Sequence, residues 1–320
     1  MILARCARRG AAWPALLAAC SRYPPQRVPP SDVVLSTSTG CARLFNKLQN
    51  MRKLFAEYWR SIEGLLVRPP ASPTGYHRGL MLAPSRHALI IGNSDGIGLH
   101  STRRLLDRGW QVTGVSRRPS PVVHAAYQHH VVDVSQPDYV GRLTAIVGQG
   151  PVDTCIYCAG IGGPPDPKDL GSDVHVFEVN LMGALHTAAV IVPAMVAAGG
   201  GHLVVLSSQA DGLVLVRAPS YAASKAALSS YFEGLGLALR PRGVAVSNLR
   251  LGFVDTKMAR SGVRPFMYTL DQAVDVVESV LRKRPLRLTR PLTTALLVCL
   301  LAWLGRWRVF LARGPNSSRA

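Results

Sequence analysis

Apolar runs of strand length alternate with helically spaced segments from residue 88 onward. Six apolar runs are predicted to be strands: ALII (88–91), QVTGVS (111–116), HHVVDV (129–134), DTCIYC (153–158), HLVVLS (202–207) and VAVSNL (244–249). The segments near 137–148, 174–199 and 219–240 are predicted to be helices, and another helix follows the first strand as far as Arg108, where Gly109 stops it. This alternation predicts a parallel sheet covered on both faces, an α/β fold of the doubly wound type.

The residues before this alternation follow a helical pattern over part of their length. Apolar side chains in residues 42–67 recur at spacings of three and four, which predicts an amphipathic helix. RPPASPTG (68–75) then reads as a linker. Residues 1–31 hold five arginines and no acid around the run AAWPALLAAC. A signal segment, a lipoprotein cleavage box ending at Cys20, an arginine-rich transit peptide, a disordered leader and a true start at Met81 all remain open for these residues.

The other end of the chain is apolar and basic. Its apolar core, residues 292–304, would form a helix about 20 Å long, which is short of the ~30 Å that a bilayer requires. Trp303, Trp307 and the flanking arginines are typical of a helix that lies in the membrane interface. A helix docked on the domain or on a second subunit is the alternative. We expect a basic leader over 1–85, one domain over 86–291 and this tail over 292–320.

Charge is distributed unevenly along the chain. The first 86 residues carry 13 Lys and Arg against 3 Asp and Glu, residues 87–260 carry 14 against 12, and residues 261–320 carry 10 against 3. The near-neutral middle argues against a nucleic-acid partner. Basic ends with interleaved Leu, Trp and Phe suit an anionic membrane surface better.

Two of the six cysteines are spaced as C-x-x-C, but they do not predict a metal or redox site. Cys155 and Cys158 lie in a predicted strand, where positions three apart face opposite sides of the sheet. The sequence contains no second pair of this kind. We therefore expect no metal ion and no disulfide framework.

A glycine motif stands where the first strand meets the following helix. Gly92, Gly96 and Gly98 have the spacing G-x-x-x-G-x-G in IIGNSDGIGLH. Glycine lets the backbone turn sharply and approach a pyrophosphate, while the helix start offers unpaired N–H groups and a partial positive charge. We predict a dinucleotide site of the Rossmann type, and a glycine turn without a ligand is the alternative. The expected contacts in this loop are Gly92, Ser94, Asp95, Gly96, Ile97 and Gly98.

The ends of the following strands favour NADP over NAD. A cofactor with a free ribose 2′-hydroxyl usually meets an acidic residue near the end of the second strand, and GVSRRPS has none. Arg117, with Arg118 beside it, is expected to face a 2′-phosphate; a solvated basic turn is the alternative. Asp133 is placed to accept a hydrogen bond from the adenine amino group. The remaining contacts expected at these strand ends are Val134, Ala159 and Gly160.

A tyrosine and a lysine lie four residues apart in SYAASKAALSSY (220–231). On a helix, Tyr221 and Lys225 share one face, and the alanines and serines between them keep that face narrow. A phenol with a cation beside it can act as a proton donor, because a nearby ammonium favours the phenolate and lowers a pKa that is otherwise near ~10. For this pair alone, an exposed helix face is the simpler explanation.

Seven motifs in order make the chain resemble the short-chain dehydrogenase/reductase family. They are GNSDGIG, VVDV, CAG, FEVN, VVLSS, YAASK and LGFVDT. The resemblance covers roughly residues 86–260 and continues more weakly to 291. It implies a single Rossmann domain with an NADP-preferring site, and the apolar tail is similar to that of a bacterial subgroup of the same family.

The resemblance also implies a role for each residue that matches a family motif. Tyr221 would be the general acid/base, Lys225 would bind the nicotinamide ribose, and Ser208 would hydrogen-bond the reacting oxygen. Asn180 would hold a water that links Lys225 to solvent. The loop after the sixth strand would contact the cofactor through Gly252, Val254 and Thr256.

Three departures from the family pattern bear on these roles. Ile91 replaces a threonine before the first glycine, and Tyr157 with Cys158 replaces two asparagines; both changes are expected to soften hydrogen bonding around the loops. Leu251 replaces a proline before Gly252 and would change how a substrate lid sits. None of them removes a catalytic group.

We therefore expect an NADP(H)-dependent oxidoreductase that interconverts a carbonyl and an alcohol on an apolar, acyl- or lipid-like small molecule, with NAD a less favoured cofactor. The expected location is cytoplasmic, at the inner membrane surface if the basic apolar ends contact lipid. A homodimer or homotetramer is implied by the family. Two other functions remain open: a non-catalytic NADP(H)-binding Rossmann module, and a membrane-tethered scaffold.

Overall fold

The computed structural model describes residues 86–257 and 266–311. The predicted leader, amphipathic helix and linker before residue 86 lie outside the described residues, as does the part 258–265 of the predicted substrate lid VDTKMARSGVRPFMYT (254–269). The strands are β1 (His87–Ile91), β2 (Gln111–Ser116), β3 (Tyr127–Val131), β4 (Thr154–Tyr157), β5 (Gly201–Ser208), β6 (Val244–Leu251) and β7 (Arg287–Arg290). The helices are α4 (Gly96–Asp107), α5 (Tyr139–Val147), α6 (Gly171–Phe177), α7 (Gly183–Ala197), α8 (Pro219–Leu239), α9 (Leu270–Lys283) and α10 (Leu292–Leu311). Three short helical turns complete the list: η1 (Glu178–Met182), η2 (Gln209–Gly212) and η3 (Arg240–Arg242).

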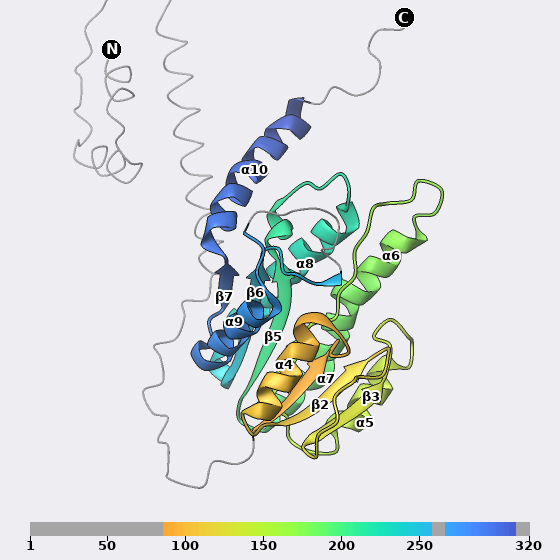
Figure 1. Cartoon of the computed structure of the whole chain (residues 1–320), viewed down its shortest axis with the longest axis vertical. Helices are drawn as coiled ribbons and strands as arrows, with labels where there is room; N and C mark the ends of the chain where they lie inside the picture. Colours follow the sequence, from red (N-terminus) through yellow and green to blue (C-terminus); the bar gives the residue numbers. More distant parts are fainter. Residues whose placement is uncertain (1–85, 258–265, 312–320) are drawn as a thin grey trace, which may run out of the picture. The chain divides into compact units, whose positions relative to one another are not determined.

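The strands form one parallel sheet in the order β3-β2-β1-β4-β5-β6-β7. In this order the chain first builds outward from β1 to β3 and then returns to build the other half from β4. The point of reversal lies between β1 and β4, where Ile91 is in register with Tyr157. The predicted α/β class with a doubly wound parallel sheet is confirmed (Figure 1).

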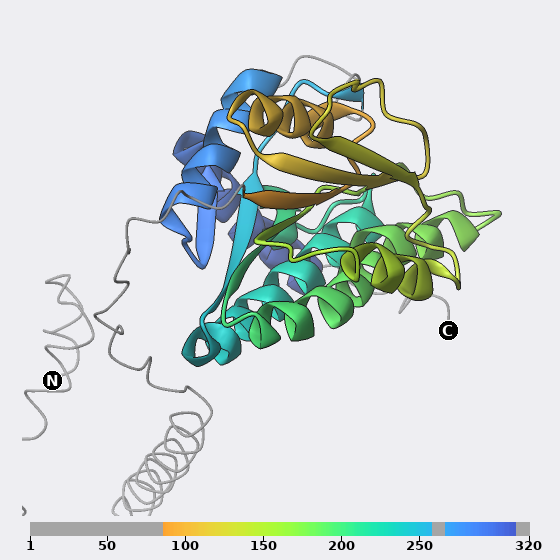
Figure 2. The same ribbon diagram turned by 90° about the horizontal axis from the view of Figure 1, so that it is seen from below.

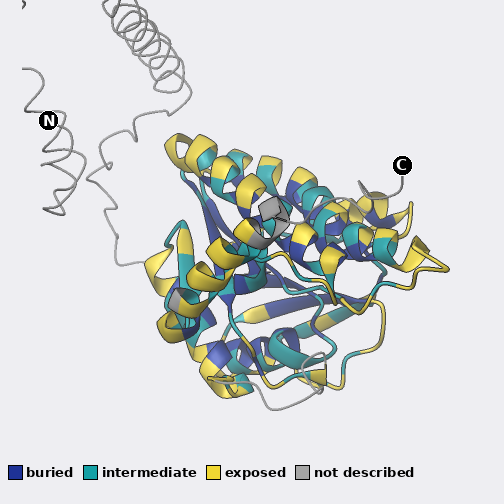
Figure 3. Cartoon of the chain, turned by 90° about the horizontal axis from the view of Figure 1, so that it is seen from above, coloured by how far each residue is buried: buried dark blue, intermediate teal, exposed yellow. Residues whose placement is uncertain are grey.

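Successive strand residues face two separate cores because side chains alternate across a strand. Leu89 and Ile91 of β1 pack into a core shared with α5, α7 and α8, whereas Ala88 and Ile90 pack into one shared with α4 and α9. Figure 2 shows the sheet between these two helical layers. The five inner strands are mostly buried, the edge strands β3 and β7 are partly exposed, and the outer faces of the helices are exposed (Figure 3). The two layers leave the ends of the strands as the places where a site can form.

Several predicted boundaries and elements differ from the structure. The third strand ends at Val131, before Asp133, so the predicted strand 129–134 is displaced toward the C-terminus. The hydrophobic pattern of the sequence did not predict α9 or β7. The start of α9 nevertheless carries a signal, because Thr269 and Gln272 form a reciprocal capping box. Cys155 and Cys158 pack against opposite cores, as the strand assignment predicted.

Two helical segments have an apolar composition that bears on membranes. The stretch Gly171–Ala197 is long and apolar enough to cross a bilayer, but Val179, Ala188 and Ile191 within it pack in the core against the sheet. Helix α10 is longer than the thirteen-residue apolar core suggested, since it continues to Leu311. Its apolar part, Leu292–Gly305, is shorter than a membrane span. In Figure 1 α10 rises from the end of β7 away from the sheet.

Candidate active site

The glycine loop lies at the carboxyl end of β1, beside the end of β4. Gly92 has φ +86°, and a Cβ there would lie 2.6 Å from the backbone nitrogen of Ala159. A Cβ on Gly98 would lie 2.2 Å from the carbonyl oxygen of Gly92. Both positions therefore require glycine, because backbone atoms cannot move aside. The sharp turn directs the start of α4 toward the groove between β1 and β4, where doubly wound sheets bind ligands.

A carboxylate at this turn joins three segments that are far apart in the sequence. Asp95 caps α4 by accepting a hydrogen bond from the Gly96 amide (2.9 Å). Its other oxygen lies 2.6 Å from Lys257 Nζ and 3.9 Å from Arg118 Nη2. The hydrogen bond from Lys257 holds the pKa of Asp95 below its usual value. Thr256 Cγ2 lies 3.5 Å from the position of a Cβ on Gly96, so the loop after β6 closes over the glycine loop.

The predicted arginine turn and adenine-side carboxylate lie at the ends of β2 and β3. Arg117 and Arg118 are exposed just after β2. Asp133 accepts hydrogen bonds from the amide (3.0 Å) and the hydroxyl (2.8 Å) of Ser135. Burial raises the pKa of Asp133, but these hydrogen bonds and the charge of Arg117 outweigh it and hold the pKa below its usual value. The Val134 side chain is buried in the core, so only its backbone could meet a ligand.

Tyr221 and Ser208 come together from α8 and the end of β5. Tyr221 lies in the first turn of α8, where Pro219 is favourable. The Ser208 side chain lies close enough to Tyr221 to act on the pKa of the phenol. Burial raises the pKa of Tyr221, the interaction with Ser208 opposes this rise, and the charge of Asp211 adds to it. The Tyr221 ring lies 2.8 Å from the position of a Cβ on Gly162, so the segment after β4 crosses closely over the ring.

Lys225 is buried one turn further along α8. Its Nζ donates a hydrogen bond to the carbonyl oxygen of Leu206 (2.8 Å) and lies 5.9 Å from the centre of the Tyr221 ring. Burial lowers the pKa of Lys225 to about 8. The expectation that this ammonium lowers the pKa of Tyr221 differs from the structure, where that pKa is raised. The reason is that the phenol is buried and the ammonium is directed at the Leu206 carbonyl.

Asn180 lies on the π-turn η1 and connects the segment after β4 to α8. Its Oδ1 accepts from the Ile161 amide (2.8 Å), and its Nδ2 donates to the Ile161 carbonyl (2.9 Å) and to Ser224 Oγ (3.0 Å). Asn180 Oδ1 and Lys225 Nζ each lie 3.5 Å from the position of a Cβ on Gly160. A π-turn inside a helix is frequent at functional sites. The water relay through Asn180 stays a prediction.

One predicted departure has the opposite effect in the structure. Tyr157 was expected to soften hydrogen bonding near the loops. Instead its buried hydroxyl donates to the carbonyl oxygen of Val179 (2.6 Å), the residue before Asn180. A Cβ on Gly183 would lie 2.4 Å from this hydroxyl, so the glycine makes room for it. Tyr157 therefore supports the π-turn from the sheet side.

The loop after β6 is closed on one side by the start of α10. The Gly252 amide donates to the carbonyl oxygen of Arg290 (2.8 Å), and Thr294 Oγ1 lies 3.1 Å from the position of a Cβ on Gly252. Val254 is buried and bridges to Tyr268. Gln209, next to Ser208, donates to the carbonyl oxygens of Arg290 (2.9 Å) and Pro291 (3.0 Å). Gln209 was not predicted as a site residue, because its partners are more than eighty positions away in the sequence.

A buried ion pair beneath the site was also missed. Arg250 Nε donates to Asp211 Oδ2 (2.6 Å), and Arg250 Nη2 pairs with the other carboxylate oxygen. Ser229 Oγ donates to the same carboxylate (2.6 Å) and contacts Ser207 Oγ (2.7 Å). The Asp211 side chain is only 6% exposed. The pair therefore ties the turn that follows Ser208 to β6. A single charged residue near the end of the buried sixth strand was the available signal.

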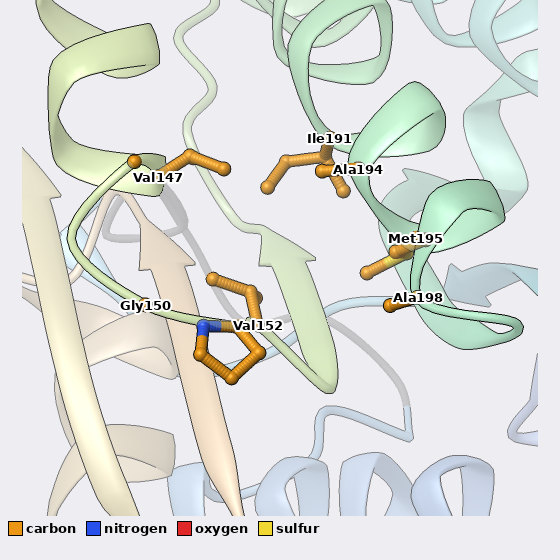
Figure 4. A pocket seen from close by; sticks show the side chains of 9 residues that line it. Val147, Gly150, Val152, Ile191, Ala194, Met195 and Ala198 are labelled. Carbon is orange, nitrogen blue, oxygen red and sulfur yellow. The ribbon is translucent and has the colours of Figure 1, made fainter.

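A separate apolar pocket lies at the other edge of the sheet. It is lined by Val147 at the end of α5, by Val152 in the α5–β4 connection, and by Ile191, Ala194 and Met195 of α7 (Figure 4). Val152 precedes β4, so this pocket is at the amino end of the strands, opposite the glycine loop. Its apolar lining offers no catalytic group. Within the described ranges 86–257 and 266–311, no group of three or more His, Cys, Asp or Glu could hold a metal ion.

Comparison with known proteins agrees with this arrangement. The family model described as short chain dehydrogenase matches residues 86–264. An oxidoreductase of Myxococcus xanthus is 30% identical over 60% of this chain and 82% of its own length. Human retinol dehydrogenase 8 is 30% identical over 55% of this chain and 61% of its own length.

A solved structure shares the fold. It is a short chain dehydrogenase of Burkholderia cenocepacia J2315 in complex with NADP, which is 23% identical and matches 72% of this chain and 98% of its own with a TM-score of 0.63. The family match spans more than half of the chain and begins where the described domain begins. The chain belongs to the short-chain dehydrogenase/reductase family of oxidoreductases.

Proposed function

We propose that this protein is an NADP(H)-dependent oxidoreductase that interconverts a carbonyl and an alcohol, with Tyr221 as the general acid/base. The observation that carries the proposal is the meeting of Tyr221, Ser208 and Lys225 beside the glycine loop, at the carboxyl edge of the sheet. Asn180 joins this cluster through its bond to Ser224. A Rossmann module that only holds a nucleotide would not need a buried lysine beside a partly buried phenol.

The residues present fit a nicotinamide dinucleotide. Gly92 and Gly98 allow the turn that exposes the start of α4, and Gly96 has φ +55°, with Thr256 Cγ2 3.5 Å from the position of its Cβ. The first N–H groups of a helix suit a pyrophosphate. Arg117, exposed at the end of β2, would bind a 2′-phosphate, in keeping with the NADP in the Burkholderia structure. When bound, the cofactor supplies or accepts the hydride.

The proton chemistry follows from the positions of three side chains. Tyr221 would transfer a proton between its Oη and the substrate oxygen, while Ser208 would hydrogen-bond the same oxygen and hold it within reach. Lys225, with a pKa lowered to about 8, would carry a proton that can be exchanged near neutral pH. Asn180 would hold the segment after β4 in place and support a relay from Lys225 to solvent.

Exposed apolar side chains follow the site elements and favour an apolar substrate. They occur on the η2–α8 connection and beside the lid, at Val214, Val216, Phe253, Phe266 and Met267. The similarity to a retinol dehydrogenase supports this class. We therefore propose an apolar, acyl- or lipid-like carbonyl or alcohol as the substrate.

We also propose that α10 makes a peripheral contact with an anionic membrane surface. Leu300, Trp303, Leu304 and Trp307 are about half exposed, so the helix presents an apolar face to solvent. No acidic residue follows Glu278 in the sequence, whereas several arginines do. Apolar area combined with basic charge binds anionic lipid. An intracellular location fits such a contact, and a dimer or tetramer is the assembly that family membership suggests.

Titration of the purified protein with NADPH and with NADH tests the cofactor assignment. NADPH is expected to bind more tightly than NADH. Arg117→Ala is expected to lower this preference by about tenfold or more, since a charge-assisted contact contributes about 1.5–3 kcal/mol. A screen of apolar aldehydes and ketones, with Tyr221→Phe as the inactive control, tests the reaction. Binding without turnover of any carbonyl or alcohol would favour the non-catalytic module.

Vesicle sedimentation tests the membrane contact. The full chain should sediment with vesicles that contain anionic lipid and much less with neutral ones. Leu300→Glu combined with Leu304→Glu should reduce sedimentation, while Val174→Glu, an exposed site on α6, should not. Equal sedimentation of both variants would refute a role for α10. Loss of an oligomer in the α10 variant, with unchanged lipid binding, would assign the helix to a second subunit.

A further inference from the structure

A chain of hydrogen bonds runs beneath the cofactor side of the site, from the glycine loop to the arginine turn. Asn93, within the glycine loop, donates through Nδ2 to Tyr127 Oη (2.5 Å). Tyr127 Oη lies 3.0 Å from His129 Nδ1, and His129 Nε2 lies 3.1 Å from the carbonyl oxygen of Arg118. These hydrogen bonds thus connect the end of β1, the strand β3 and the turn after β2.

The protonation states of Tyr127 and His129 determine which group donates and which accepts in each of these hydrogen bonds. Tyr127 Oη accepts from Asn93, and the burial that raises the pKa of Tyr127 keeps its hydroxyl protonated, so this hydroxyl donates to His129 Nδ1. Burial also lowers the pKa of His129, which keeps the imidazole neutral with a single N–H. That N–H is then on Nε2 and donates to the Arg118 carbonyl.

Gly114 leaves room for these hydrogen-bonding side chains. A Cβ on Gly114 of β2 would lie 1.9 Å from Asn93 Nδ2 and 2.6 Å from Tyr127 Oη. Any larger residue at position 114 would occupy the place where these two groups meet. Asn93 is fully buried, and its Oδ1 has no hydrogen-bond partner among the described residues. A buried amide that is only half satisfied adds little to stability, so its presence calls for another explanation.

These hydrogen bonds end on the peptide that joins Arg118 to Pro119. The Arg118 carbonyl oxygen accepts a second hydrogen bond from Ser116 Oγ (2.8 Å). Two donors from two strands therefore hold the backbone of the turn that carries both arginines. The Arg118 guanidinium is directed back toward Asp95 in the glycine loop, whereas the Arg117 charge acts on Asp133.

We propose that Tyr127 and His129 are positioning residues that set the NADP preference of the enzyme by holding the turn at Arg117 in place for a 2′-phosphate. This inference rests on the proposed NADP preference and adds the residues that enforce it. Neither side chain is proposed to touch the cofactor. Their loss should therefore weaken the contact that only a 2′-phosphate makes, and leave contacts with the rest of the dinucleotide unchanged.

The test compares dissociation constants for NADPH and NADH in the full chain and in matched variants. Tyr127→Phe removes the hydroxyl that accepts from Asn93 and orients His129, whereas His129→Leu removes only the donor to Arg118. His129→Gln keeps an N–H at nearly the position of Nε2 and should rescue. Tyr231→Phe, the same change at an exposed site on α8, is the control. Thermal unfolding of each variant verifies the fold, and Tyr127→Phe carries the test if His129→Leu does not fold.

The expected result is a loss of selectivity. NADPH should bind about tenfold more weakly to Tyr127→Phe and His129→Leu, the effect of misplacing one charge-assisted contact, while NADH binding changes less than about twofold. His129→Gln and Tyr231→Phe should keep the preference. Equal weakening of both cofactors, or an unchanged preference in His129→Leu, overturns the inference. If Arg117→Ala abolishes the preference but these variants keep it, only the positioning role fails. If the unmodified protein shows no preference for NADPH, the proposed cofactor fails as well.

Discussion

Replacing Lys225 with methionine is expected to stabilise the protein at neutral pH while abolishing turnover. Burial lowers the pKa of this lysine from its ordinary value of 10.5 to about 8. Each pKa unit corresponds to about 1.36 kcal/mol, so holding the charge in the folded state costs about 3 kcal/mol at pH 7. Loss of the bond from Nζ to the Leu206 carbonyl offsets about 1 kcal/mol of the gain. The expected net gain is about 2 kcal/mol, or a rise in melting temperature of roughly 4–8 °C.

The pH dependence of this gain identifies its cause. Between about pH 8 and 10.5 the unfolded lysine binds more protons than the folded one, so the unmodified protein gains stability relative to the variant as pH rises. Urea unfolding of both proteins at pH 7 and at pH 10 measures the difference in their free energies of unfolding. The contributions of all other titrating groups are the same in both proteins and cancel in this difference. The advantage of Lys225→Met should be largest at pH 7 and nearly absent near pH 10. A variant that is less stable at pH 7, or a difference that does not change with pH, would refute the reasoning.

Two further substitutions probe the supports of the site. Arg250→Met leaves the Asp211 carboxylate buried without its partner and should lower the free energy of unfolding by about 3–5 kcal/mol, measured by urea denaturation. Adding Asp211→Asn should recover a large part of that loss, because the uncompensated charge is gone. Tyr157→Phe removes the bond to the Val179 carbonyl and should cost about 1–3 kcal/mol, since a buried acceptor is left unpaired. Turnover should fall in the same variant, because the π-turn that carries Asn180 loses its support.

Each of these two expectations has its own contradicting result. If the double variant at Asp211 and Arg250 loses as much free energy of unfolding as the two single variants together, the two residues are not coupled and the ion-pair argument is wrong. If Tyr157→Phe unfolds at the same urea concentration as the unmodified protein, its hydroxyl does not support the turn. Tyr231→Phe provides the control for loss of an exposed tyrosine hydroxyl.

The elements that the sequence predicted well are those with strong local patterns. The strand at 111–116 was placed with its observed bounds, and the helix at 219–240 with nearly its observed bounds. The third strand was displaced because VVDV is apolar beyond the point where pairing with β2 ends at Val131. The short strand β7 was missed because its residues, RLTR, show no apolar run.

The sequence by itself determined the order of the six predicted strands and of the helices between them, and it identified the residues that follow those strands. Parallel strands bring their carboxyl ends to one edge, so Gly92, Asp133, Ser208 and Gly252 meet there whatever the details of packing. The spacing of Tyr221 and Lys225 likewise follows from the helical repeat alone. These features depend on local periodicity and on the topology of the sheet.

Only the tertiary structure decided what surrounds these groups. The bonds from Asn93 through Tyr127 to His129, and the pair between Asp211 and Arg250, join residues from different elements. Such contacts depend on strand register and on side-chain direction, which spacing along the chain does not encode. The pKa of Tyr221 belongs to the same class, because it reflects burial and the direction of the Lys225 ammonium rather than the interval between the two residues.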